Sequence, residues 1–237
     1  MRDQYAADLS DYLKFALLRT LSGAERKLGI AWYYIPENDR RNDGQHLEWQ
    51  QDITWRLLDP ELFDALRNLP ERSIKALENA KIWPHGTLFH REPIPSRRLR
   101  DAWITQMYAQ LENSELVFFD PDNGLGTHPK KHATFSELRG LRASTRAIVS
   151  IKFPAMSNYE RQADEFHNRL RHETGTTCGF TVFTNVSVPR KSDPRYVVQR
   201  PRWFTVIDAD ATLLDRANRY ALLLSSLPQA KARIVSF

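Results

Sequence analysis

The fold is decided by one short stretch of the chain, Leu116-Val117-Phe118-Phe119-Asp120-Pro121-Asp122-Asn123-Gly124. Its four apolar residues follow one another without a polar interruption, which predicts a buried strand. Such strands are typical of parallel sheets covered by helices on both faces. Polar residues follow at once, and Pro121 and Asn123-Gly124 favour a tight turn. Because ligands bind at the carboxyl ends of strands in open α/β sheets, we expect the functional centre here.

Strands and helices alternate on both sides of this stretch. A helix is expected from Ser10, taken as its N-cap, to about Ser22, where Gly23 ends it. The other expected helices cover residues 60–69, 72–79, 98–111, 136–141, 158–173 and 212–224. Extended segments are expected at 28–35, 86–92, 147–153, 179–185, 203–208 and 232–237.

The alternation predicts an α/β protein, with one Rossmann-like three-layer domain over residues 1–237 and an N-terminal helix. The sheet should be mostly parallel. No clear helix lies between 179–185 and 203–208, which indicates an antiparallel pair at one edge. A long basic loop, from Val186 to Arg202, is expected to join these two strands.

Composition narrows the class of protein. The chain of 237 residues has one cysteine, Cys178, so it has no internal disulfide framework and a reducing compartment is expected. Its start is polar and no apolar run is long enough to span a bilayer, which predicts a cytoplasmic protein without a membrane partner.

A net charge of +5 accompanies basic clusters in the chain. Basic residues beside Tyr196 in the expected loop suit nucleic acid, since cations pair with phosphates and aromatic rings stack on bases. A solvated surface loop is the alternative. The candidate nucleic-acid-binding residues are Arg190, Lys191, Arg195 and Arg200.

The candidate catalytic residues are Asp120, Asp122 and Asn123, which can accept protons, orient an amine or bind a divalent cation. A turn whose side chains only cap backbone amides is the alternative. Asp11 and Lys14 lie three residues apart in the first helix, where they can simply pair with each other. No G-x-G-x-x-G, P-loop, H-E-x-x-H or G-x-S-x-G motif occurs.

The segments 8–19 (DLSDYLKFALLR) and 118–125 (FFDPDNGL) resemble an uncharacterised bacterial and prophage family. More distantly, the chain resembles class I S-adenosylmethionine methyltransferases, above all the ribosomal RNA adenine-N6 methyltransferases and the three-Cys-motif partner proteins. The resemblance implies that Asp120-Pro121 faces a target amine. It also implies that residues near the first helix and the first strand hold S-adenosylmethionine, here Asp11, Lys14, Glu37 and Asp43.

The chain departs from that pattern in two places. Asp122 and Asn123 stand where the methyltransferase motif has its aromatic residue, and residues 34–38 after the first expected strand contain no glycine. Three functions are therefore expected as alternatives. The first is a methyltransferase-like enzyme acting on nucleic acid. The second is a metal-dependent nuclease or phosphoesterase of a phage-defence or prophage system, in which Asp120 and Asp122 bind Mg²⁺ and Lys152 positions water. The third is a non-catalytic nucleic-acid-binding Rossmann-like module.

Overall fold

A computed structural model describes residues 1–37, 46–127, 132–143, 145–190 and 192–237. The helices are α1 (Leu9–Ser22), α2 (Pro60–Arg67), α3 (Ile74–Asn79), α4 (Arg100–Gln110), α5 (Phe135–Leu141), α6 (Tyr159–Thr174) and α7 (Ala211–Ser225). The strands are β1 (Leu28–Ala31), β2 (Leu88–His90), β3 (Leu116–Phe119), β4 (Ala147–Lys152), β5 (Gly179–Arg190), β6 (Asp193–Ile207) and β7 (Ala230–Ser236).

In the part of the chain that the structure describes, the strands form one sheet in the order β2-β1-β3-β4-β6-β5-β7. Neighbours from β2 to β4 pair in parallel. Strand β6 is antiparallel to both β4 and β5, and β7 is antiparallel to β5. Five strands thus run in one direction, while β6 and β7 run in the other. The prediction of an α/β protein with a mostly parallel sheet and an antiparallel edge is confirmed.

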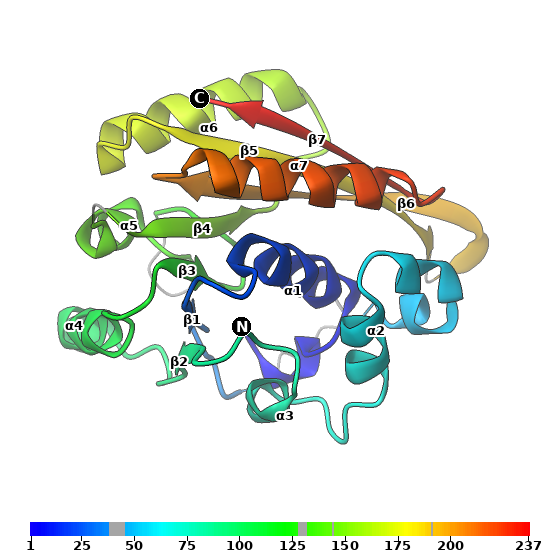
Figure 1. The fold of residues 1–237 in the computed structure, drawn as a ribbon, viewed down its shortest axis with the longest axis horizontal. Helices are drawn as coiled ribbons and strands as arrows, with labels where there is room; N and C mark the ends of the chain where they lie inside the picture. The colour runs from blue at the N-terminus through cyan, green and yellow to red at the C-terminus, as the bar shows by residue number, and fades with distance from the viewer. Residues whose placement is uncertain (38–45, 128–131, 144, 191) are drawn as a thin grey trace.

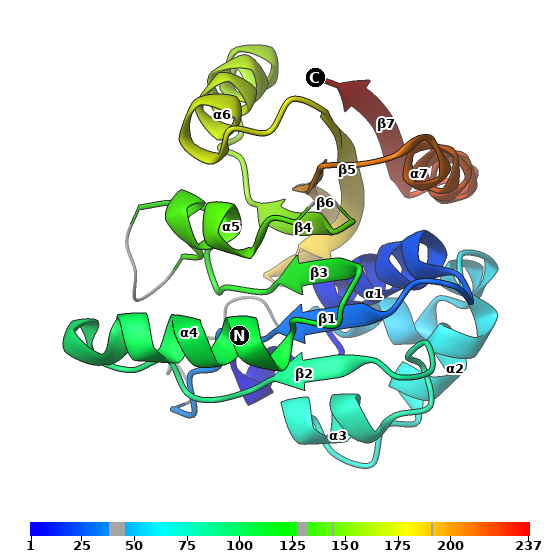
Figure 2. The same cartoon turned by 60° about the vertical axis from the view of Figure 1, so that its left-hand side comes forward.

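Helices cover both faces of the sheet. Figures 1 and 2 show α1, α2, α3 and α7 on one face and α4, α5 and α6 on the other. The four residues of β3 are all apolar because both faces of the strand are covered. Leu116 and Phe118 pack in the core on the side of α1 and α7, and Val117 and Phe119 pack in the core on the side of α4 and α5. All four are fully buried. A strand with two buried faces has no position for a polar residue, and the polar residues begin where β3 ends.

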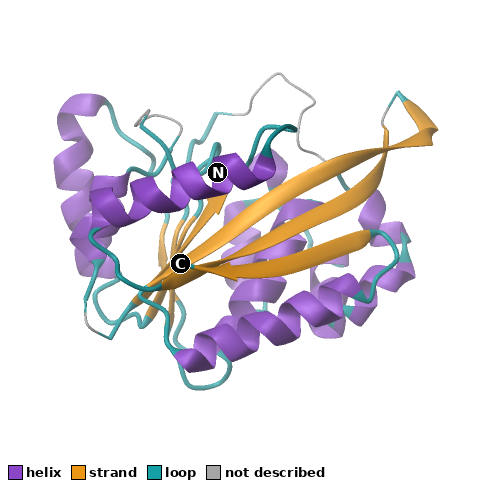
Figure 3. Ribbon diagram, turned by 90° about the horizontal axis from the view of Figure 1, so that it is seen from above, coloured by secondary structure: helices purple, strands orange, loops and turns teal. Residues whose placement is uncertain are grey.

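The long basic loop predicted from Val186 to Arg202 is wrong. Strands β5 and β6 pair without interruption from Gly179 opposite Ile207 out to Pro189 opposite Val197, with an irregularity at the tip. Prolines occur at 189, 194 and 201, and proline is normally unfavourable in a strand. They are tolerated because they lie beyond the register of the other neighbours: β4 pairs with β6 only at residues 203–207, and β7 with β5 only at 180–186. Figure 3 shows the hairpin running past the rest of the sheet.

Two local boundaries also differ from expectation. The N-cap of α1 is Asp8, whose side chain accepts a hydrogen bond from the Asp11 amide, whereas Ser10 lies inside the helix. Strand β1 ends at Ala31, and Tyr33 soon after takes a left-handed backbone angle (φ 47°) that a strand does not allow. Within the described ranges, the structure contains no helix with the length and apolar character of a membrane span.

Candidate functional site

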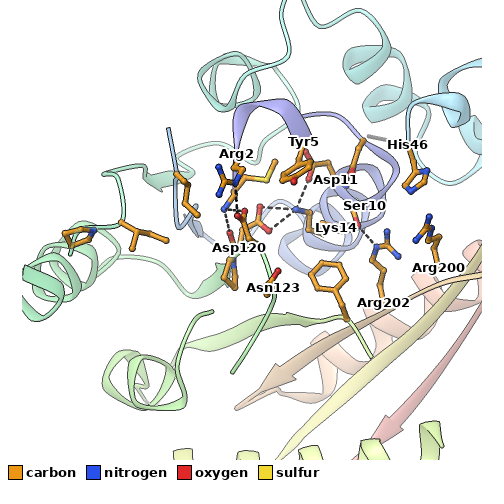
Figure 4. A pocket seen from close by; sticks show the side chains of 18 of the residues that line it. Arg2, Tyr5, Ser10, Asp11, Lys14, His46, Asp120, Asn123, Arg200 and Arg202 are labelled. Carbon is orange, nitrogen blue, oxygen red and sulfur yellow. Dashed lines mark hydrogen bonds and ion pairs between the residues drawn. The ribbon is translucent and has the colours of Figure 1, made fainter. Parts of the chain in front are cut away.

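A cavity of about 1030 Å³ lies at the edge of the sheet where the parallel strands end. It falls at the upper end of the range of small-molecule sites. Strand β6 runs the other way, so its first half reaches the same edge. The wall comes from the N-terminal segment (Met1, Arg2), the start of α1 (Asp8, Ser10, Asp11, Lys14), the residues after β1, β2 and β4 (Ile35, Ile94, Phe153), the turn after β3 (Asp120–Asn123) and β6 (Arg200, Arg202). Figure 4 shows most of them converging on one space.

The turn after β3 is held against the neighbouring strand β4. Gly124 has a left-handed backbone angle (φ 77°), and a Cβ atom at this position would lie 2.4 Å from the carbonyl oxygen of Ile151. The next residue, Leu125, donates its amide to the same oxygen. Only glycine permits this close approach without strain. The turn therefore places Asp120 and its neighbours over the end of the sheet rather than away from it.

Lys14 and two carboxylates form the centre of the site. The Lys14 ammonium donates to both carboxylate oxygens of Asp120, at 2.8 and 2.9 Å, and lies 2.7 Å from Asp11 Oδ1. Lys14, Asp11 and Asp120 are each at most 5% exposed. Burial lowers the pKa of Lys14, but the attraction of the two carboxylates exceeds that effect and raises it overall. Lys14 is therefore a fixed cation that orients the Asp120 carboxylate.

The cluster holds more carboxylates than Lys14 can neutralise. Burial, together with repulsion from Asp120, raises the pKa of Asp11 to about 6 even though Lys14 opposes the shift. Burial and repulsion from Asp11 raise the pKa of Asp8 to about 7. Near neutral pH, this end of the cavity can therefore hold or release a proton. Such carboxylates are also suited to binding an ammonium group or hydroxyl groups of a ligand.

Asp122 is held by the N-terminal segment. Arg2 Nε donates to Asp122 Oδ2 at 3.1 Å, and the Met1 ammonium lies 2.8 Å from Oδ1. The second contact is an ion pair without hydrogen-bond geometry, since Oδ1 has no hydrogen-bond donor. The Met1 ammonium donates instead to the carbonyl of Tyr33 at 2.8 Å. Asp122 is thus a partner of the N-terminal cations, and Asp120 is the carboxylate nearer to Lys14.

The structure brings together most of the predicted site residues. Asp120, Asp122 and Asn123 line one cavity with Asp11 and Lys14, and Asn123 lies exposed at its rim. Arg200, predicted as a nucleic-acid-binding residue, also lines this cavity.

Other predicted residues lie elsewhere. The Glu37 side chain is exposed and off the cavity wall, although its carbonyl accepts a hydrogen bond from Arg2. Arg190 is exposed at the end of β5, and Arg195 is exposed and bound by Asp193 at 2.8 and 2.9 Å. Asp43 and Lys191 lie outside the described residues.

The sequence reasoning missed Asp8 and Arg202 as site residues. The signal for Arg202 was its spacing of two from Arg200, which puts both side chains on one face of a strand. That signal was hidden by the assignment of the region to a loop.

Lys152, which the nuclease alternative places beside Asp120, lies away from it. Lys152 does not line the cavity with Asp120; its ammonium lies 5.2 Å from the centre of the Phe166 ring on α6. Burial, with repulsion from Arg169, lowers its pKa. Among the described residues, no three histidine, cysteine or acidic side chains come together as metal ligands.

Comparison with known proteins identifies a shared fold. No protein-family model matches the chain, and no curated protein matches it. Among solved structures, the chain is similar to a crystal structure of a Legionella pneumophila protein assigned to the family DUF519, with a TM-score of 0.54. The alignment covers 98% of each chain at 11% sequence identity. The two proteins therefore share a fold along nearly their whole length.

Proposed function

We propose that this protein is an S-adenosylmethionine-dependent methyltransferase acting on an amine of a nucleic-acid base. The observation that carries the proposal is the position of Asp120. This carboxylate follows a strand flanked by β1 and β4, and Lys14 fixes it at the wall of a cavity large enough for a cofactor and a base. The antiparallel strand β6 next to β4 supports a Rossmann-like domain of the methyltransferase type.

The residues of the cavity fit S-adenosylmethionine in charge and size. Its methionine end carries an ammonium group, for which Asp8 and Asp11 are partners, and its sulfonium favours a site rich in carboxylates. Ile35, Ile94 and Phe153 supply apolar wall for a ring. The segment after β1 lacks the glycines that cradle a cofactor in many Rossmann proteins, so side chains of α1 would hold it instead.

The bound cofactor would supply an electrophilic methyl group. Asp120 accepts a hydrogen bond from the target amine, which orients the nitrogen lone pair toward the cofactor side of the cavity. As the nitrogen becomes positive, the buried Asp120 carboxylate stabilises that charge, and it accepts the proton that the nitrogen loses after the methyl group has been transferred. Lys14 keeps the carboxylate in place because its ammonium donates to both oxygens. Each oxygen retains a lone pair with which it can accept a hydrogen bond from the target amine.

The first experiment measures binding and methyl transfer. Calorimetry should show that S-adenosylmethionine and S-adenosylhomocysteine bind, and labelled methyl should enter RNA or DNA extracts. Asp120→Ala should lower transfer by about 10²-fold or more, since it removes the group that stabilises the developing charge. Asp164→Asn, an exposed change on α6, is the matched control and should leave transfer unchanged.

The outcomes separate the alternatives. Absence of cofactor binding at high protein concentration refutes the proposal. If nucleic acid still binds in that case, the non-catalytic module is supported. Cleavage of nucleic acid that EDTA abolishes would instead support the metal-dependent nuclease, for which the described residues provide no metal cluster.

A further inference from the structure

Two arginines of β6 stand together on the wall of the cavity. Arg200 and Arg202 are two residues apart on one strand, so both point to the face that carries α1. Phe204 and Val206, which continue the same alternation, pack in the core on that face. Figure 4 shows the two guanidinium groups side by side, near Ser10 and away from Asp120.

Protein groups leave this pair of cations poorly neutralised. Arg202 is 7% exposed, and its hydrogen bonds go to the Ser10 hydroxyl and, at 3.3 Å, to the carbonyl of Pro201. Arg200 has a buried Nε atom without a hydrogen-bond partner, and no ion pair joins it to any residue in the described ranges.

Asp8 is the carboxylate that attracts Arg202. Because the pKa of Asp8 is raised to about 7, Asp8 carries only part of its negative charge at neutral pH. Burial, with repulsion from Arg200, lowers the pKa of Arg202 to about 10, so the side chain is still charged. A buried and a half-buried arginine with so few protein partners favour an anion.

The chemistry of the pair suits a phosphate group. Guanidinium groups bind phosphate through two parallel hydrogen bonds, and an unpaired Nε adds a further donor. The pair lies at the base of the part of the β5–β6 hairpin that extends past the sheet. That extension carries the exposed side chains Arg190 and Tyr196, the latter 62% exposed. A polyanion that followed the hairpin would enter the cavity beside the two arginines.

We propose that Arg200 and Arg202 form a phosphate subsite, which binds a backbone phosphate of the nucleic-acid substrate beside the nucleotide whose base reaches Asp120. This inference rests on the proposed function for the identity of the substrate. The subsite itself follows from the arginines, which belong to a strand that contributes neither Lys14 nor Asp120. Contacting groups connect the two ends of the cavity: Asp120 to Lys14, Lys14 to Asp11, and Ser10 on the same helix to Arg202.

The test compares ligands that differ only in a phosphate. Calorimetric titration with adenosine and with adenosine 5′-monophosphate should show tighter binding of the monophosphate to the wild-type protein. Arg200→Gln should remove most of this preference, and Arg200→Lys should keep part of it because it retains the charge. Arg161→Gln is the matched control, because Arg161 is exposed on α6 and pairs with Glu165 outside the cavity. It should leave the preference unchanged.

A second measurement uses a fluorescent single-stranded RNA and its anisotropy at several salt concentrations. Arg200→Gln should weaken binding about tenfold and reduce the salt slope by about 0.7, the value for one phosphate contact on a single strand. Equal binding of the two adenosine ligands to the wild type, or an unchanged salt slope in the variant, overturns the subsite.

The source of the anion is tested with the cofactor. If Arg200→Gln abolishes S-adenosylmethionine binding while RNA binding is unchanged, the arginines bind the cofactor carboxylate and the phosphate assignment is wrong. If the wild-type protein binds no S-adenosylmethionine but prefers the monophosphate through Arg200, the proposed function fails and the phosphate subsite stands.

Discussion

Replacing Lys14 with methionine is the most direct perturbation of the site. Methionine keeps the length and much of the volume of the lysine stem but removes its ammonium. The change removes both hydrogen bonds that the Asp120 side chain accepts in the described structure. Asp11 keeps the hydrogen bond that it accepts from the Ala7 amide. Both carboxylates stay buried because they are held by elements far apart in the sequence.

The magnitude follows from the burial of the three groups. Removing one partner of a buried ion pair costs about 3–5 kcal/mol of folding free energy, because the other charge remains without compensation. We expect a loss in this range for Lys14→Met at pH 8. Lys14 is charged throughout the range from pH 5 to pH 8, since its pKa is raised.

The pH dependence of the loss therefore belongs to the carboxylates. Without the lysine, which lowers the pKa of Asp11, the already raised pKa of Asp11 in the folded protein rises further, so this carboxylate takes up a proton as the pH falls. At pH 5 the loss should shrink to about 2 kcal/mol or less.

Urea unfolding followed by tryptophan fluorescence at pH 5 and pH 8 measures both quantities. Lys75→Met is the control, because Lys75 is exposed on α3, and it should change stability by less than about 0.5 kcal/mol. Adding Asp120→Asn to Lys14→Met should restore part of the loss at pH 8. A loss below about 1 kcal/mol at pH 8, or an equal loss at both pH values, would refute the buried cluster described above.

Three further substitutions, at Asp8, Asp210 and Gly124, are tested by their effect on stability. Asp8→Asn keeps an acceptor at the start of α1 but removes a carboxylate whose pKa is raised to about 7 by burial. Between about pH 4 and 7, Asp8 holds a proton in the folded wild type that it loses in the unfolded chain, so the stability of the wild type falls as the pH rises through this range. The variant should therefore melt at a higher temperature than the wild type at pH 8, and at a similar temperature near pH 4. Asp210→Asn, at the start of α7, should lower the melting temperature at pH 8. Despite partial burial, hydrogen bonds from the helix and from Arg26 lower the pKa of Asp210, so its carboxylate stabilises the folded protein at this pH. Gly124→Ala should lower the free energy of unfolding in urea by about 2–4 kcal/mol and should also weaken cofactor binding. The control is Gly86→Ala, which has the same backbone angle but no atom within 4 Å and should cost only about 1 kcal/mol. Equal costs would contradict the close approach to Ile151.

Local physics made part of the fold readable from the sequence. The apolar run of β3 has the predicted bounds, because an unbroken apolar tetrapeptide followed by Asp-Pro has few other solutions. Gly23 and Gly175 end α1 and α6 as predicted, since both take backbone angles that other residues avoid. For the same reason, the polar turn lies where it was predicted, at the edge where the parallel strands end.

The β5–β6 hairpin could not be predicted in the same way. A proline normally excludes a strand, and only the sheet register shows that Pro189 and Pro201 lie where β5 and β6 have passed their other neighbours. The alternation of Arg200 and Arg202 therefore remained invisible as a cationic face.

The sequence by itself determined that Asp120 lies at the end of a buried strand and that Asp11 and Lys14 share a helix face. Only the tertiary structure decided that these groups meet. Lys14 and Asp120 are 106 residues apart, and Ser10 and Arg202 are 192 residues apart. Such contacts depend on strand order and on the packing of α1 against the sheet, and neither leaves a local signal in the residues concerned. The charge balance of the cavity, with excess carboxylate at one end and a buried and a half-buried arginine at the other, is a property of the folded chain.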